Sequence, residues 1–310
     1  MLQYLSQFPS RIQSKYAFSL SSTQKQLGLI AIGLAVCWWL VGLWLLQTET
    51  TFQIWGDQRY IFLRDSADAL HPYNNVGFFN MPWTRIFLVP FTIPRFELGV
   101  FGQILLYFVL LSAVVHRFSD SSVSSTRQRI TLLIALCSPF AFDTAIEVNI
   151  DWIVVLGLLV PPAYSAPFIL TKPQVALGYV ASFKWATIVR WTIVFLIVFL
   201  LSFLIWGAWP IDLYARSQEY PIGVAVNVSP MNIIGLVPSL LIAITLLLVA
   251  FVRKDAVVGI WGGIFLMPYI ASYSILLPFT LLAIRFPRAM GVFTLALWIG
   301  VGIIIVPGLL

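Results

Sequence analysis

Charged residues are scarce in this sequence, and their scarcity excludes an ordinary soluble fold. Only 10% of the 310 residues are Asp, Glu, Lys or Arg, and 60% are hydrophobic. Soluble domains carry about 25% charged residues. Apolar runs near the ~20 residues needed to cross a bilayer recur along the chain. We therefore expect an all-α polytopic membrane protein in a lipid bilayer, with one domain over residues 1–310 and roughly 8–10 transmembrane or broken helices.

Cysteine and histidine are rarer still, with two of each. Cys37 and Cys137 both lie in apolar runs, so we interpret them as buried small side chains rather than disulfide partners or metal ligands. The sequence has no Walker A, GxGxxG, GxSxG or HExxH motif. Paired aspartates that would hold a metal–nucleotide-sugar are missing from the predicted inner loops. The sequence thus predicts no metal, no other cofactor and no cytosolic nucleotide donor.

The formal charge of +6 reflects membrane topology rather than nucleic-acid binding. Arg11, Lys15 and Lys25 precede the first apolar run, which places segment 1–26 in the cytoplasm. Ten of the 12 acids fall on the predicted outer side. We expect a multi-pass protein of the plasma (inner) membrane. Twelve of the 18 Lys and Arg residues fall on predicted inner ends: Arg11, Lys15, Lys25, Arg117, Arg127, Arg129, Lys184, Arg190, Arg253, Lys254, Arg285 and Arg288.

Proline and polar residues divide the chain into long and short apolar pieces. The first span is predicted at 27–46 and is followed by an extracytoplasmic loop, 47–97. Between residues 152 and 183, prolines break three pieces that are each too short to span. The other predicted segments are an interfacial helix at 83–94, spans at 97–115, 130–142, 188–209, 231–252 and 290–306, a pair of pieces within 257–277, an inner loop at 116–129 and an outer loop at 210–230.

The first outer loop concentrates polar and aromatic residues in an otherwise apolar chain. Asp57, a few residues past the first span, is a candidate general base, or else an ordinary solvated or Arg-paired carboxylate. Arg59, Arg64 and Arg85 lie on the outer side, against the topology rule. They indicate either an anionic ligand such as a phosphate or pairing with nearby aspartates. His71 is a further candidate for this site.

Lys172 is the basic residue that most needs an explanation. It lies between apolar runs beside a proline, and an intramembrane lysine is costly without a partner. Asn149 and Asp151, close to Asp143 and Glu147, fall where one helix is predicted to end and the next to begin. They would bind a cation or a sugar, or cap a helix.

Three aromatic residues of the first outer loop are candidates for stacking on a sugar. They are Tyr60, Tyr73 and Trp83. Most other aromatic side chains in the sequence are expected to face lipid or the membrane interface.

An ordered set of short motifs resembles the GT-C superfamily of membrane glycosyltransferases, and within it the bacterial polyprenyl-phosphate-mannose-dependent α-mannosyltransferases. The motifs span most of the chain. In order they are Asp57-x-x-Tyr60, Pro72-Tyr73, Phe79-x-x-Pro82-Trp83, Ile93-Pro94, Phe96–Gly99, Asn149-Ile150-Asp151, Lys172-Pro173-Gln174 and Pro268-Tyr269 followed by Tyr273.

The resemblance implies a GT-C-like helical bundle and a role for two residues. Asp57 would act as base on the acceptor hydroxyl, and Lys172 would lie near the donor phosphate. The sequence hypothesis is therefore transfer of a sugar such as mannose from a polyprenyl-phosphate donor to an extracytoplasmic acceptor. Two alternatives remain open: a non-catalytic subunit that keeps the scaffold and binds membrane protein partners, and a small transporter.

Overall fold

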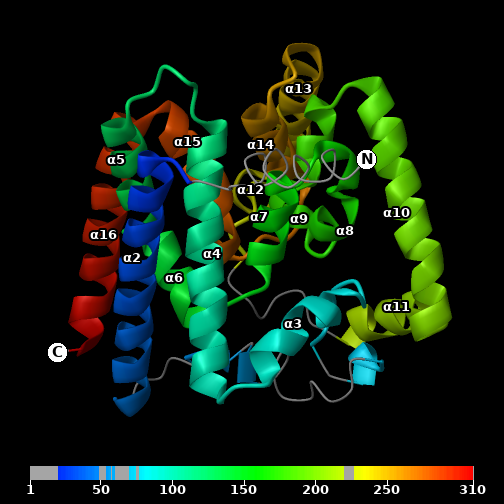
Figure 1. Ribbon diagram of the computed structural model, residues 1–310, viewed down its shortest axis with the longest axis horizontal. Helices are drawn as coiled ribbons and strands as arrows, with labels where there is room; N and C mark the ends of the chain where they lie inside the picture. Colours follow the sequence, from blue (N-terminus) through cyan, green and yellow to red (C-terminus); the bar gives the residue numbers. More distant parts are fainter. Residues whose placement is uncertain are drawn as a thin grey trace, which may run out of the picture.

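The computed structural model describes residues 20–48, 54–56, 58–59, 70–74, 77–219 and 227–309, and these residues form helices joined by short turns (Figure 1). The predicted all-helical fold is confirmed there, and the described residues contain no strand. The first half contains α2 (Ser22–Gln47), η4 (Pro72–Asn74), α3 (Thr84–Thr92), α4 (Phe96–Phe118), α5 (Ser125–Leu136), α6 (Pro139–Glu147), α7 (Asp151–Leu159), η5 (Pro162–Tyr164) and α8 (Ala166–Ile169). The second contains α9 (Pro173–Ala176), η6 (Leu177–Ser182), α10 (Trp185–Trp206), α11 (Trp209–Glu219), α12 (Pro230–Ile234), α13 (Leu236–Arg253), α14 (Ala256–Leu266), η7 (Ser272–Ile275), α15 (Leu276–Arg285) and α16 (Pro287–Leu309).

Four of the described helices, α2, α4, α10 and α13, are long and apolar enough to cross a membrane. A fifth span results if α5 and α6, which meet at a 56° bend, are counted together. The predicted span at 130–142 is this bent pair, and the bend occurs where Ser138 caps α6 and Pro139 occupies its first position. Helix α16 corresponds to the predicted span at 290–306, and the other helices are shorter pieces, as the proline breaks predict.

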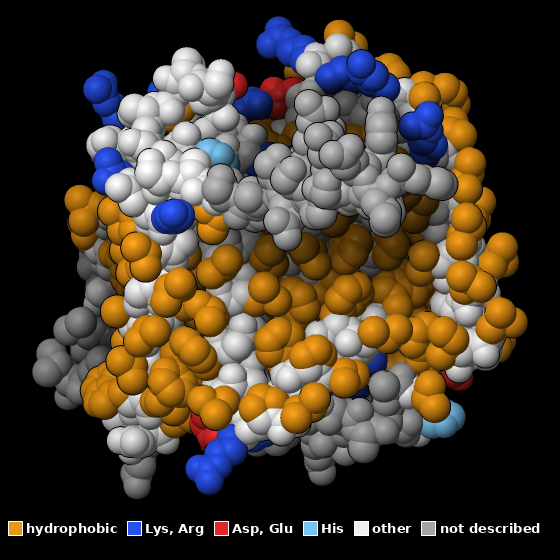
Figure 2. Space-filling model, in the orientation of Figure 1, with side chains coloured by type: hydrophobic (Ala, Val, Ile, Leu, Met, Phe, Trp, Pro, Cys, Tyr) orange, Lys and Arg blue, Asp and Glu red, His pale blue; other side chains and the backbone are white. Residues whose placement is uncertain are grey.

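Helix α4 forms the centre of the bundle. It packs against α2 and α7, and 61% of its most apolar window is buried. By contrast α10 buries only Trp191 and Ser202 among its 22 residues. Figure 2 shows a broad hydrophobic band across one face, with most of the visible Lys and Arg side chains at the upper edge. This distribution is that of a protein surrounded by lipid.

Two loop boundaries and the burial of the cysteines differ from the sequence prediction. The inner loop 116–129 is shorter than predicted because α4 continues to Phe118 and Ser124 caps α5 by accepting from Arg127 N. The outer loop 210–230 contains the helix α11, whose second residue is Pro210, a position where proline is tolerated. Cys37 and Cys137 are exposed on the helix surface, so their predicted burial is wrong.

One close approach between segments requires glycine. A Cβ atom on Gly178 in η6 would lie 1.9 Å from the carbonyl oxygen of Gly259 and 2.7 Å from the amide nitrogen of Gly263, both in α14. The backbones of η6 and α14 therefore touch directly. This contact fixes the chain just after the Lys172 segment.

The turns predicted to face the cytoplasm gather at one end of the molecule. The α4–α5, α13–α14 and α15–α16 turns lie together there, while α3, η4 and α11 lie at the opposite end (Figure 1). The clustering agrees with the charge pattern of the sequence.

Candidate functional site

The most deeply buried ion pair among the described residues joins Lys172 to Asp151. Lys172 Nζ lies 2.5 Å from Asp151 Oδ1, and the two side chains are 6% and 1% exposed. Asp151 is in the first turn of α7, where the helix dipole favours a negative charge. Lys172 immediately precedes α9, whose first residue is Pro173. Two residues that the sequence marked separately are thus direct partners.

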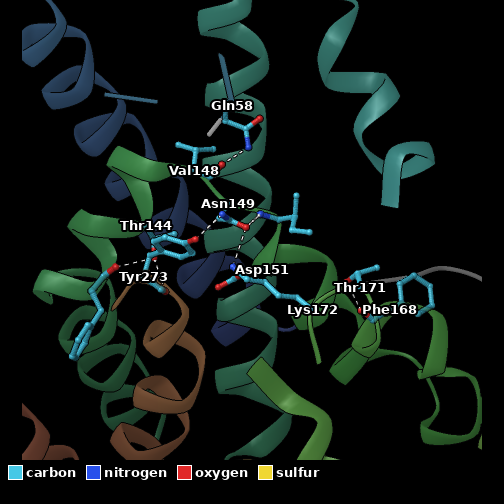
Figure 3. Close-up of polar contacts among 11 residues, drawn as sticks. Gln58, Thr144, Val148, Asn149, Asp151, Phe168, Thr171, Lys172 and Tyr273 are labelled. Carbon is cyan, nitrogen blue, oxygen red and sulfur yellow. Dashed lines mark hydrogen bonds and ion pairs between the residues drawn. The ribbon is translucent and has the colours of Figure 1, made fainter. Parts of the chain in front are cut away.

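Asn149 extends this pair into a network (Figure 3). Its Oδ1 atom accepts hydrogen bonds from Lys172 Nζ at 2.9 Å and from the backbone N–H of Ile150 at 2.8 Å. Its Nδ2 atom donates to the Tyr273 hydroxyl at 2.9 Å. Lys172 Nζ also lies 4.4 Å from the centre of the Tyr273 ring, a cation–π distance. The family-like motifs at 149–151, 172–174 and 273 therefore meet in one place.

The local backbone explains why these side chains converge. Val148 adopts a left-handed conformation, with φ of 46°, and ends α6. The turn then reverses the chain into α7, where Ile150 is the N-cap residue and makes no side-chain cap hydrogen bond. Capping by Asn149 or Asp151 is therefore wrong for α7. Both side chains point instead toward Lys172.

Apart from Asp151 Oδ1, which is engaged only by the ion pair with Lys172, two buried polar atoms beside this network have no hydrogen-bond partner in the described part of the chain. They are Asp151 Oδ2 and the hydroxyl oxygen of Tyr107 on α4. An unsatisfied buried carboxylate oxygen costs free energy, and such atoms commonly bind water or a ligand. The network therefore has unused binding capacity.

The outer-loop segment is anchored to the same turn. Gln58 Nε2 donates to the carbonyl oxygen of Val148, and Gln103 Nε2 donates to Gln58 Oε1 at 2.8 Å. Trp55 donates from its backbone N–H to Ile146 O at 2.8 Å and from its ring to Ala145 O at 2.9 Å. The chain on both sides of residue 57 is consequently held against the turn that carries Asn149.

The predicted cations of the outer end lie in different surroundings. Arg85 is 2% exposed, and its guanidinium lies 4.5 Å from the Phe78 ring centre. Arg59 is exposed, with its guanidinium 5.3 Å from the Phe96 ring centre. His71 is exposed beside η4. A phosphate site that these three side chains share with Lys172 remains a prediction.

Tyr73 and Trp83 are buried against protein. The Tyr73 ring stacks on Trp209 with centroids 6.4 Å apart, and its hydroxyl donates to Asn80 O at 2.9 Å. Burial, and then the charge of Asp212, raise the pKa of the Tyr73 phenol above its ordinary value. The phenol is therefore a hydrogen-bond donor and not a base. Trp83 donates from its ring to Pro167 O at 2.8 Å, and sugar stacking by either ring stays a prediction.

Asp57, Tyr60 and Arg64 lie outside the described residues. Within the described residues no group of three His, Cys, Asp or Glu side chains could hold a metal ion. The prediction of site residues missed Gln58 and Gln103. A lone glutamine in the apolar run of α4 was the available signal, because polar side chains inside a membrane are costly without partners.

Comparison with protein-family models, with curated proteins and with solved structures found no match. The candidate site therefore rests on its own geometry. It is a buried Lys–Asp–Asn–Tyr network, with a carboxylate oxygen left over, to which the outer loop is tied.

Proposed function

We propose that this protein is a membrane glycosyltransferase that moves a sugar, such as mannose, from a polyprenyl phosphate to a hydroxyl acceptor. The observation that supports the proposal is the position of Gln58, the residue that follows Asp57 in the sequence. Gln58 binds Val148 O, and the residue after Val148, Asn149, binds Lys172. The sequence neighbour of the proposed base is thus linked to the proposed phosphate contact through two consecutive residues.

The proposed reaction transfers one proton to the enzyme and releases polyprenyl phosphate. The Asp57 carboxylate takes the proton of the acceptor hydroxyl as that oxygen attacks the anomeric carbon. The bond from the anomeric carbon to the phosphate oxygen breaks, and polyprenyl phosphate leaves with an additional negative charge. Cations are needed where this charge develops, and Lys172, Arg59, Arg64, Arg85 and His71 are the proposed sources.

Lys172 would act from within its ion pair. An ammonium group has three N–H donors. Asp151 and Asn149 engage the lysine at 2.5 and 2.9 Å, and one donor remains for a phosphate oxygen. Asp151 would fix the position of the lysine in a low-dielectric site.

The test is transfer by the full-length protein reconstituted in liposomes. The donor is polyprenyl-phosphate mannose with a labelled sugar, and the acceptor is octyl α-mannoside. Wild type should form labelled disaccharide, and Asp57→Asn should lower the rate about 100-fold or more, because a general base contributes at least that much. Asp212→Asn is the control, since Asp212 is exposed on α11 at the same end.

Two results would overturn the proposal. One is near-normal transfer by a folded Asp57→Asn variant. The other is a folded wild type that neither transfers the sugar nor binds polyprenyl phosphate, a result that favours the non-catalytic subunit.

A further inference from the structure

A cavity of about 750 Å³ lies at the end of the molecule opposite to α3 and η4. Three turns distant in sequence form it: α4–α5, α13–α14 and α15–α16. Its charged lining is mostly cationic, with Arg117, Arg127, Arg253, Lys254 and Arg285 beside Asp255 and Asp120. The volume is within the range of about 300–1,000 Å³ that is typical of small-molecule sites.

The cavity keeps a net positive charge after its internal contacts are counted. Five cations and two carboxylates leave +3. Arg285 Nη2 pairs with Asp255 Oδ1 at 2.5 Å. The hydrogen bonds of Arg127 and Lys254 neutralise no charge, because they run to carbonyl oxygens. Arg127 Nη2 donates to Arg285 O at 3.2 Å, and Lys254 Nζ donates to Phe183 O at 2.9 Å.

These carbonyl bonds hold cationic side chains in place around the hollow. Arg117 likewise donates to Leu159 O, at the end of α7. Arg253 differs, because it is exposed and makes no hydrogen bond or ion pair with the described residues. The cavity thus combines fixed cations with one free guanidinium.

Membrane topology alone does not produce this arrangement. The topology rule explains why Lys and Arg accumulate on one side. It does not require side chains from three turns to surround a common space. Guanidinium groups match the oxygens of a phosphate in geometry and charge, and basic pockets between membrane helices bind phosphate headgroups.

We propose that this cavity binds a phosphate-bearing anion. The phosphate would sit among Arg117, Arg127, Arg253 and Lys254, with the free guanidinium of Arg253 closing onto it. An anionic phospholipid fits the surroundings, because Phe286 in the cavity wall and Val252 beside Arg253 are 57% and 77% exposed and offer an apolar surface to acyl chains. A soluble phosphate shares the same chemistry. The proposal is independent of glycosyl transfer at the other end.

Native mass spectrometry and thermal unfolding of the full-length protein test the site. The probes are phosphatidylglycerol, phosphatidylcholine and inorganic pyrophosphate. We expect one phosphatidylglycerol retained per chain and a saturable rise in melting temperature. Arg253→Gln should weaken this binding about fivefold, the effect of one Lys or Arg near an anionic lipid surface. Arg190→Gln is the matched control, because Arg190 is exposed and does not line the cavity.

The outcomes distinguish a lipid headgroup, a soluble phosphate and the absence of a specific site. Saturable binding of phosphatidylglycerol but not pyrophosphate assigns the cavity to a lipid headgroup, and the reverse assigns it to a soluble anion. Either supports the proposal if Arg253→Gln weakens it and Arg190→Gln does not. Equal effects of the two variants, or non-saturating binding of every anionic probe, would overturn it, since diffuse surface attraction behaves that way. Circular dichroism confirms that both variants are folded.

Discussion

Lys172 and Asp151 form an ion pair across the α7–α9 segment, with 2.5 Å between Nζ and Oδ1 and almost no exposure of either side chain. In a pair buried this deeply, each charge is stabilised by the other. Removing one partner leaves a buried charge uncompensated, whereas removing both leaves a neutral core.

The first prediction concerns this dependence. Asp151→Asn and Lys172→Met should each lower the free energy of unfolding by about 3–5 kcal/mol. The double variant Asp151→Asn/Lys172→Met should recover a large part of that loss. Thermal unfolding in detergent, followed by circular dichroism, measures all three. Single variants that melt at the wild-type temperature would contradict the assignment of a tightly coupled pair.

The second prediction concerns the anchor of the outer loop. Gln58→Ala leaves the Gln103 amide and the Val148 carbonyl without their partner, at a cost of about 1–3 kcal/mol. Amide hydrogen exchange should accelerate at Trp55, whose N–H is bonded to Ile146 O, and remain slow in α13. Gln26→Ala on the exposed face of α2 is the control. Unchanged exchange at Trp55 would show that Gln58 does not secure the loop.

The third prediction uses the contact between η6 and α14. Gly178→Ala would place a methyl group against backbone atoms that cannot rotate away, so we expect a loss of about 3 kcal/mol. Gly33→Ala in α2 meets nothing within 4 Å and should stabilise its helix by up to about 1 kcal/mol. Melting temperatures that move together in the two variants would contradict the direct backbone contact.

The fourth prediction concerns pH. Burial raises the pKa of the Asp255 carboxyl, but hydrogen bonds from Arg285, Val258 N and Val257 N, together with the Arg285 charge, lower it by more, so the net shift is downward. A lowered native pKa stabilises the fold above the unfolded value of about 3.9. This stability is lost as the pH falls through the native pKa.

Two variants of Asp255 separate its cap from its charge. Asp255→Ala removes the N-cap of α14 and should cost about 1 kcal/mol at neutral pH. Asp255→Asn keeps a capping oxygen, so it should lower the stability at neutral pH by less than Asp255→Ala does. It should also remove the loss of stability that the Asp255 carboxyl causes at acidic pH. Melting temperatures measured from pH 3 to 7 test this. An identical acid profile in wild type and Asp255→Asn would contradict it.

Sequence reasoning predicted the helical class and the separate polar features, but not how they combine. Lys172 was expected to need a partner, and the turn at Asn149 and Asp151 was expected to be polar. Their contact depends on how α7, η5 and α8 fold back on one another, and periodicity does not encode that packing. Gln103 shows the converse case, because one glutamine in an apolar run predicts a buried hydrogen bond without naming Gln58.

The predicted helix boundaries were wrong where a side-chain cap determines the start of the helix. Ser124 caps α5 within a serine-rich stretch that resembles a loop by composition, and Ser138 caps α6 inside an apolar run that the sequence prediction treated as one span. In the sequence, the cationic residues that line the cavity are scattered, and nothing there indicates that they lie together. The walls of the cavity come from the α4–α5 turn and from two turns more than 100 residues further along the chain, so only the folded chain brings the cations together.

Binding of a short-chain polyprenyl phosphate, followed by thermal shift, addresses the donor site directly. The control ligand is the polyprenol of the same length, and both are titrated into wild type and Arg253→Gln. We predict a saturable stabilisation by the phosphate alone, which persists in Arg253→Gln and reaches about 2.7 kcal/mol at a hundredfold excess over Kd. No shift, or the same shift with the alcohol, would contradict a donor phosphate site in this protein.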